Sequence, residues 1–273
     1  MSRLELAGNA LKDCFGNVRL WLVQFFANII LFALFAEWLR ISVSSTANLI
    51  FNLFLIVILL AAALMLHAGT LNQFADRCLG QSSPLWPSFQ RALRHLGAVA
   101  VCFAAIVGLW LAVNAFETLQ PNLPPYIRSM LPVFLRRHIT LPAVNNLFSA
   151  GAFVLRWIVA PGLVLPLLLQ AADRGFRGFD RQGFAAWWRG VRSWTYWLVL
   201  LAAALLGVMA TQALMAWTPD FRTSTFGTEA TSLTVRLTCA YLLGLFSWML
   251  TCSSVGRHAA ADGAANIGGD SQA

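Results

Sequence analysis

The sequence predicts an all-α integral membrane protein that crosses the bilayer about six times. Its 273 residues are 59% hydrophobic and only 11% charged, whereas soluble domains carry about 25% charged residues. The apolar residues also gather into blocks that match the roughly 20 residues a helix needs to cross a bilayer. So few charges could not coat a soluble domain of this length, and hydrocarbon is therefore the expected solvent.

Six spans are predicted from these blocks, because charged or turn-forming residues separate them. The spans cover residues 20–38, 47–67, 97–116, 148–170, 194–215 and 234–254. We expect residues 1–255 to form a single membrane domain. The segment 256–273 is small and polar, which predicts a disordered tail.

The first span begins after Arg19 and ends at the charged stretch around Glu37 and Arg40. Gln24 and Asn28 lie one helical turn apart within it. Amide side chains in hydrocarbon usually turn toward other helices and form hydrogen bonds there. These two amides therefore predict the packed face of the first span.

The second span closes near His67, and the third closes at Glu117. The following segment, 117–147, is rich in proline yet carries many apolar side chains. Because proline breaks long helices, this composition predicts one or two short amphipathic helices at the membrane surface. A binding lid is the alternative interpretation.

The fourth span carries an arginine, Arg156, within an otherwise apolar run. If the span starts near residue 148, Arg156 lies on the order of 12 Å along the helix, and its long side chain can reach the membrane surface. A charge in this position needs a partner, and Glu37 and Glu117 close neighbouring spans on the same side. We predict an ion pair with one of them; a substrate or lipid anion site is the alternative.

Two prolines, Pro161 and Pro166, flank Gly162 in the same span. Each proline removes an intrahelical hydrogen bond and predicts a kink. Gly162 allows a neighbouring helix or a lipid to approach closely. Broken spans occur at transport sites, but a kinked helix in an ordinary packed bundle is the favoured interpretation.

Similar basic segments precede the third and fifth spans, "FQRALRHLG" at 89–97 and "WWRGVRSWT" at 187–195. The basic residues that align are Arg91 with Arg189, Arg94 with Arg192, and Lys12 in a weaker copy ahead of the first span. Each segment predicts a basic interfacial helix that leads into a pair of spans, so the fold is expected to be three successive helical hairpins. These cations either set the topology or bind lipid phosphate.

The distribution of Lys and Arg predicts the orientation of the chain. Twelve of these residues lie in connecting segments on the side of the termini, and five lie on the opposite side. Cytoplasmic loops carry the excess of positive charge, so both termini are predicted to be cytoplasmic. An arginine-rich composition with abundant Ala and Trp favours the inner membrane of a bacterium.

The stretch "LRWIVAPGLVLPLLLQAADRGFRGFDRQGFAAWWRGVRSWTYWLVLLAAALLGV" combines a proline-containing span, a short charged loop and a basic segment. It resembles bacterial proteins related to the membrane domain of glycerophosphoryl diester phosphodiesterase. Gln170 stands where that family often has an acid, and Gly190-Val191-Arg192-Ser193 approximates a second element of the family. The resemblance covers about a third of the chain and implies a membrane module without its hydrolase, because a β/α barrel of about 250 residues has no room here.

No familiar catalytic motif or metal-ligand spacing is present in the sequence. We therefore expect a non-catalytic membrane protein without a cofactor or metal, acting as a lipid-contacting scaffold or as an accessory subunit. Its expected partners are anionic lipids and either another membrane protein or a second copy, but not nucleic acid. The alternatives are a small permease with a site near the fourth span and, third, a membrane-embedded lipid-modifying enzyme.

Overall fold

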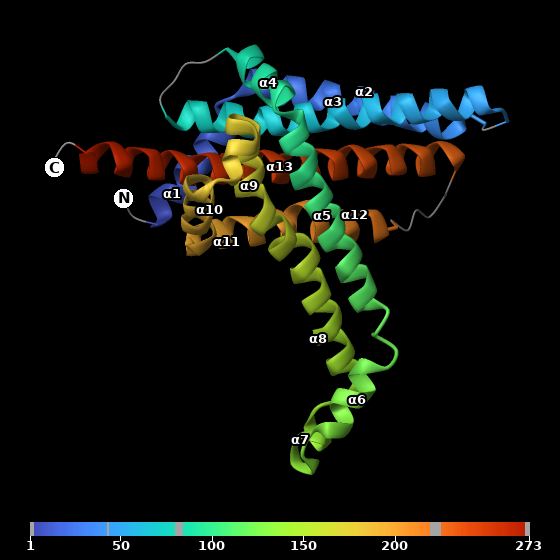
Figure 1. Ribbon diagram of the computed structural model, residues 1–273. Coiled ribbons are helices and arrows are strands. Elements are labelled where there is room, and N and C mark those ends of the chain that lie inside the picture. Colours follow the sequence, from blue (N-terminus) through green and yellow to red (C-terminus); the bar gives the residue numbers. More distant parts are fainter. Residues whose placement is uncertain (1–2, 43, 80–83, 219–224, 271–273) are drawn as a thin grey trace.

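The computed structural model describes residues 3–42, 44–79, 84–218 and 225–270. Within these ranges, every regular element is a helix (Figure 1). Arg222, which entered the predicted charge count, and residues 271–273 of the predicted tail lie outside the described residues. The all-α prediction is confirmed.

The helices follow one another with short connections. The first half of the chain holds α1 (Arg3–Phe15), α2 (Val18–Arg40), α3 (Thr46–Cys78), α4 (Leu85–Arg94), α5 (Leu96–Glu117), α6 (Leu123–Met130) and α7 (Val133–His138). The second half holds α8 (Leu141–Val154), the π-helical turn η1 (Leu155–Val159), α9 (Ala160–Arg174), the 3₁₀ turn η2 (Gly175–Phe179), α10 (Arg181–Arg192), α11 (Trp194–Ala204), a second π-helical turn η3 (Leu205–Ala210), α12 (Thr211–Ala216) and α13 (Phe226–Asp270).

Six of these helical stretches are long and apolar enough to cross a membrane. They are Val18–Arg40, Thr46–Cys78, Leu96–Glu117, Leu141–Phe179, Trp194–Ala216 and Phe226–Ala259. The chain is therefore a multi-pass membrane protein, and the number of predicted spans is confirmed.

Helix caps move two of the predicted boundaries. The fourth span begins at Leu141 rather than at 148, because the Thr140 side chain accepts a hydrogen bond of 3.3 Å from the Ala143 N–H. At the start of α3, Ser45 accepts in the same way from the Asn48 N–H at 3.2 Å. A hydroxyl that satisfies a free N–H favours the helix start at that residue.

Residues 256–270, which were predicted to belong to a disordered tail, continue α13 as a helix. Arg257 of this extension pairs with Asp13 of α1 and also donates to the Asn9 carbonyl at 2.9 Å. These contacts hold the start of the extension against α1.

The spans pair as three hairpins, α2 with α3, α5 with α8 and α9, and α11 and α12 with α13. In Figure 1, the first and third hairpins run in a similar direction, whereas α5 and α8 point away from them with α6 and α7 at their tip. Both chain ends lie near one end of the first and third hairpins, together with α1 and α10. We call this end of the bundle the terminal side, and the other end the opposite side.

The fourth span is the central helix of the bundle. In its most apolar window 44% of the residues are buried, compared with 11–22% in the other five spans. It packs against α3, α5, α11 and α13. Elsewhere large apolar side chains face outward, as Phe32 and Leu147 do with 74% exposure each, which suits helices surrounded by lipid.

The amides of the first span form the packed face predicted for it. Gln24 is fully buried and donates to Thr70 Oγ1 and, at 3.4 Å, to the Leu66 carbonyl of α3. Asn28 donates to Gln24 Oε1 at 2.7 Å. Short helices α6 and α7 also occupy the 117–147 segment, as its proline pattern predicts.

Candidate functional site

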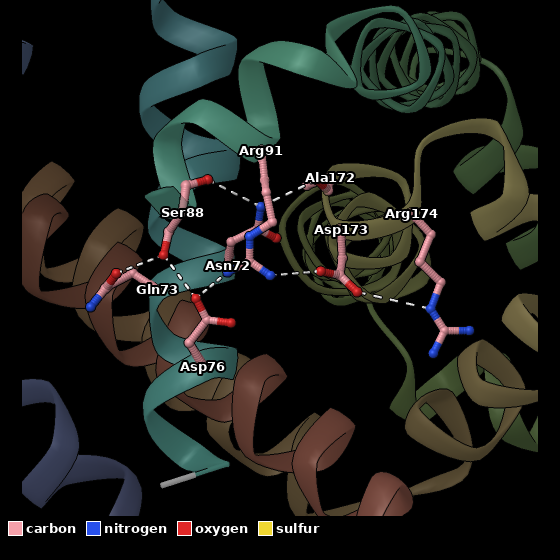
Figure 2. Close-up of polar contacts among 8 residues, drawn as sticks. All are labelled: Asn72, Gln73, Asp76, Ser88, Arg91, Ala172, Asp173 and Arg174. Atoms are coloured by element: carbon pink, nitrogen blue, oxygen red, sulfur yellow. Dashed lines mark hydrogen bonds and ion pairs between the residues drawn. The ribbon is translucent and has the colours of Figure 1, made fainter. Parts of the chain in front are cut away.

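A network of ion pairs joins three helices on the terminal side. Arg91 of α4 pairs with Asp76 of α3, and its Nη1 lies 2.9 Å from Oδ1 of Asp173 at the end of α9 (Figure 2). Ser88 Oγ lies 2.8 Å both from Asp76 Oδ2 and from Gln73 Oε1. The Asp76 side chain is only 5% exposed. Its charge is therefore balanced by the guanidinium of Arg91 rather than by water.

Asn72 adds a second link among the same helices. Its Nδ2 donates to the Ser88 carbonyl at 3.3 Å and to the Ala172 carbonyl at 3.2 Å (Figure 2). Because Asn72 is only 1% exposed, these bonds replace contacts with water that the amide lost on folding. We call Asn72, Gln73, Asp76, Ser88, Arg91 and Asp173 the polar clamp.

The ends of α3 and α9 share a sequence motif that the sequence analysis did not identify. The stretch Gln73-Phe74-Ala75-Asp76-Arg77 ends α3, and Gln170-Ala171-Ala172-Asp173-Arg174 ends α9. The two stretches agree at four of five positions, and each precedes one of the basic interfacial helices. We call the end of α3 with α4 the first unit, and the end of α9 with α10 the second unit. The repeated Gln-x-Ala-Asp-Arg motif was a readable signal for Asp76 and Asp173.

The basic residues expected at the membrane surface divide into two groups. Arg91, which was expected to set the topology or to bind lipid phosphate, pairs with two carboxylates of the protein. The other residues expected in that role have exposed side chains: Lys12 on α1, Arg94 on α4, and Arg189 and Arg192 on α10.

A pocket of about 420 Å³ lies in the second unit, between α9, α10 and α13. Its polar wall consists of Gln170, Arg174, Gln182, Arg189 and His258. Small side chains leave the space open, namely those of Ala185, Ala186 and Gly190 on α10. None of the described residues that line the pocket is acidic. The described lining therefore carries two arginines and no carboxylate.

His258 joins α13 to the start of α11 beside the pocket. Its Nδ1 lies 2.7 Å from the Ser254 carbonyl, which can only accept, so Nδ1 carries a proton. Its Nε2 lies 2.8 Å from Ser193 Oγ and 3.3 Å from Thr195 Oγ1. These contacts fix the position of the imidazole ring at the pocket wall.

At the prolines of the fourth span, a backbone carbonyl accepts a hydrogen bond from a neighbouring helix. Pro166 has no N–H, so the Gly162 carbonyl loses its intrahelical donor, and Tyr196 Oη donates to that carbonyl at 3.0 Å instead. A Cβ at Gly162 would collide with the Trp197 ring, so glycine permits the close contact with α11. Pro161 is the second residue of α9, two positions after the end of the π-helical turn η1. Pro166 thus leaves the Gly162 carbonyl without an intrahelical donor, and Tyr196 of α11 supplies a donor instead.

Arg156 lies in η1 and faces α5. Its Nη2 is 2.6 Å from Glu117 Oε2 and also donates to Asn114, and its guanidinium lies 4.8 Å from the centre of the Trp110 ring. Of the two acids that the sequence nominates, Glu117 is the partner, whereas Glu37 pairs within its own helix. This ion pair connects spans three and four on the opposite side.

The remaining candidates are His67 and the side chains that could bind a metal ion. His67 packs edge-on against Trp248 with ring centroids 5.0 Å apart, and its Nδ1 has no hydrogen-bond partner in the described part of the chain. Within the described residues, no group of three or more His, Cys, Asp or Glu side chains is placed to hold a metal ion. Comparisons with protein-family models, with curated proteins and with solved structures found no match to this chain.

Proposed function

We propose that the chain is a non-catalytic membrane protein whose terminal side contacts anionic lipid, as a scaffold or as an accessory subunit of a larger assembly. The single supporting observation is the pairing of exposed arginine with exposed tryptophan on α4 and α10. Trp86 accompanies Arg94 on α4, and Trp188 accompanies Arg192 on α10. Tryptophan favours the headgroup layer, and arginine attracts anionic headgroups there.

The same reasoning supports a bacterial inner membrane location with both termini in the cytoplasm. The anionic lipid contacts would then lie in the cytoplasmic leaflet, where positively charged segments are most common. The resemblance to a membrane module without its hydrolase agrees with a non-catalytic role.

Mass spectrometry of the protein extracted in native lipid nanodiscs tests this proposal. We expect enrichment of anionic lipid over the surrounding membrane, and we expect Arg94→Gln with Arg192→Gln to lower it. Arg40→Gln is a matched control, because Arg40 is an exposed arginine at the far end of α2. A stoichiometric protein in the same spectra would identify the accessory-subunit role. A lipid composition equal to that of the membrane would contradict the proposal.

A small permease is the second candidate, supported by the broken fourth span beside the Arg156 pair. Transport requires that water reach this span from both sides of the membrane. A single cysteine at Val164, which is 4% exposed, would react with a water-soluble maleimide from both sides if the protein were a permease. The scaffold role predicts no labelling from either side.

A further inference from the structure

We propose that the pocket of the second unit binds the phosphate group of a phosphate ester. This inference deepens the lipid-binding function proposed above and rests on it for the source of the ligand. The pocket volume of about 420 Å³ lies within the range of small-molecule sites. It can hold a phosphate together with a glycerol-sized group.

Two guanidinium groups supply the affinity for the anion. Arg174 extends from the end of α9, and Arg189 extends from the middle of α10, so the two line the pocket from different helices. Arginine binds phosphate oxygens with two parallel hydrogen bonds, which makes it well suited to this group. The Asp173 carboxylate lies 3.9 Å from Nε of Arg174, but it lies closer to Arg91, at 2.9 Å.

The remaining walls suit an ester rather than a bare ion. Gln170 and Gln182 present amide groups that can donate to phosphate oxygens or bond to hydroxyl groups. The lining also includes apolar side chains, those of Pro166, Leu169 and Val255. An ester with a charged head and a less polar body matches this arrangement.

A comparison with the first unit supports a built site. There Ser88 occupies the position of Ala186, and Asn72 occupies the position of Leu169. Both polar residues fill the first unit and bond to its neighbours. The second unit has smaller or apolar residues at these positions and leaves a space that Arg174 and Arg189 line.

Native mass spectrometry with added lipid tests the pocket. The probes are phosphatidylglycerol, presented in detergent micelles, and soluble glycerol 3-phosphate as a competitor. We expect Arg174→Gln and Arg189→Gln each to weaken the tightest phosphatidylglycerol adduct about tenfold, the effect of losing one charge-assisted hydrogen bond. Ala186→Leu should weaken the adduct without removing a charge, because the longer side chain fills the space.

Arg181→Gln is the control, since it removes the same charge from the same helix outside the pocket lining. It should leave the tightest adduct unchanged. Competition by glycerol 3-phosphate would identify a soluble ester as a sufficient ligand, and a failure to compete would identify the membrane lipid as the source. Equal loss in the Arg181 and pocket variants, or no loss in any of them, would overturn the pocket proposal.

The two proposals fail separately. Anionic lipid enrichment that is insensitive to the pocket variants would leave the lipid-contacting function and remove the pocket. Binding of glycerol 3-phosphate that depends on Arg174, without any lipid enrichment, would leave the pocket and remove the lipid-contacting function. Thermal unfolding of each variant shows that it remains folded, which is expected because Arg174 and Arg189 are exposed.

Discussion

The two units begin with the same Gln-x-Ala-Asp-Arg motif but differ in how tightly they pack. In the first unit, Asp76 is buried and pairs with Arg91 of the same unit. In the second unit, Asp173 is 43% exposed and reaches across to that same arginine. Polar residues of the first unit therefore bond to one another. In the second unit, by contrast, Asp173 pairs with Arg91 of the first unit, and a pocket lies between the helices. Repeated sequence positions thus acquire different roles through the residues around them.

Two glycines at helix contacts also indicate tighter packing in the first unit than in the second. A Cβ at Gly69 of α3 would lie 2.5 Å from the Phe89 ring of α4, so these helices touch closely. A Cβ at Gly190 of α10 would meet Pro166 only at 3.8 Å. At these two contacts the helices of the first unit lie closer together than those of the second.

Among the variants that compare the two units, Asp76→Asn is expected to change the free energy of unfolding most. The substitution removes the buried carboxylate that balances Arg91 and should lower the free energy of unfolding by about 3 kcal/mol. Asp173→Asn is the matched control, and because Asp173 is much more exposed its loss should stay below about 1 kcal/mol. Both values come from unfolding in mixed detergent micelles followed by circular dichroism. Equal losses would show that the two acids are equivalent.

A smaller effect is expected from Gly69→Ala. The added methyl group presses on the Phe89 ring, and overpacking of this kind costs about 2 kcal/mol. Gly190→Ala, at a helix contact of the second unit, should not lower stability because only ordinary contact with Pro166 results. Thermal unfolding of the two variants side by side measures the difference. A larger loss for Gly190→Ala would contradict the packing difference between the units.

The smallest effect is expected from exchanging the residues that distinguish the units. Ser88→Ala introduces the residue of the second unit and removes the hydroxyl beside Asp76, which should cost about 1 kcal/mol. Ala186→Ser makes the reverse change at the pocket, where the hydroxyl can remain hydrated, so stability should not change. Urea titration of both proteins provides the comparison. Neutral behaviour of Ser88→Ala would show that the hydroxyl is dispensable in the polar clamp.

The spans and their order could be predicted because the bilayer selects for length and apolar composition, which are local properties of the sequence. The amide pair Gln24 and Asn28 was predicted to face another helix for the same reason, since hydrocarbon offers amides no other partner. The pairing of Arg257 with Asp13 could not be predicted in this way, because it joins residues from the two ends of the chain.

The contacts of the candidate site could not be predicted from local properties of the sequence alone. The sequence narrowed the partner of Arg156 to two acids, but only helix packing selected Glu117 over Glu37. The Gln-x-Ala-Asp-Arg repeat was readable, yet nothing in it distinguishes the buried Asp76 from the exposed Asp173.

The sequence by itself determined that this chain is a six-span helical membrane protein with basic interfacial helices on the side of its termini, because hydrophobic length and charge act on each segment separately. Only the tertiary structure decided which arginine is neutralised and which lines a pocket. That outcome depends on distances between helices far apart in the chain, where one residue, Arg91, meets acids from two different spans.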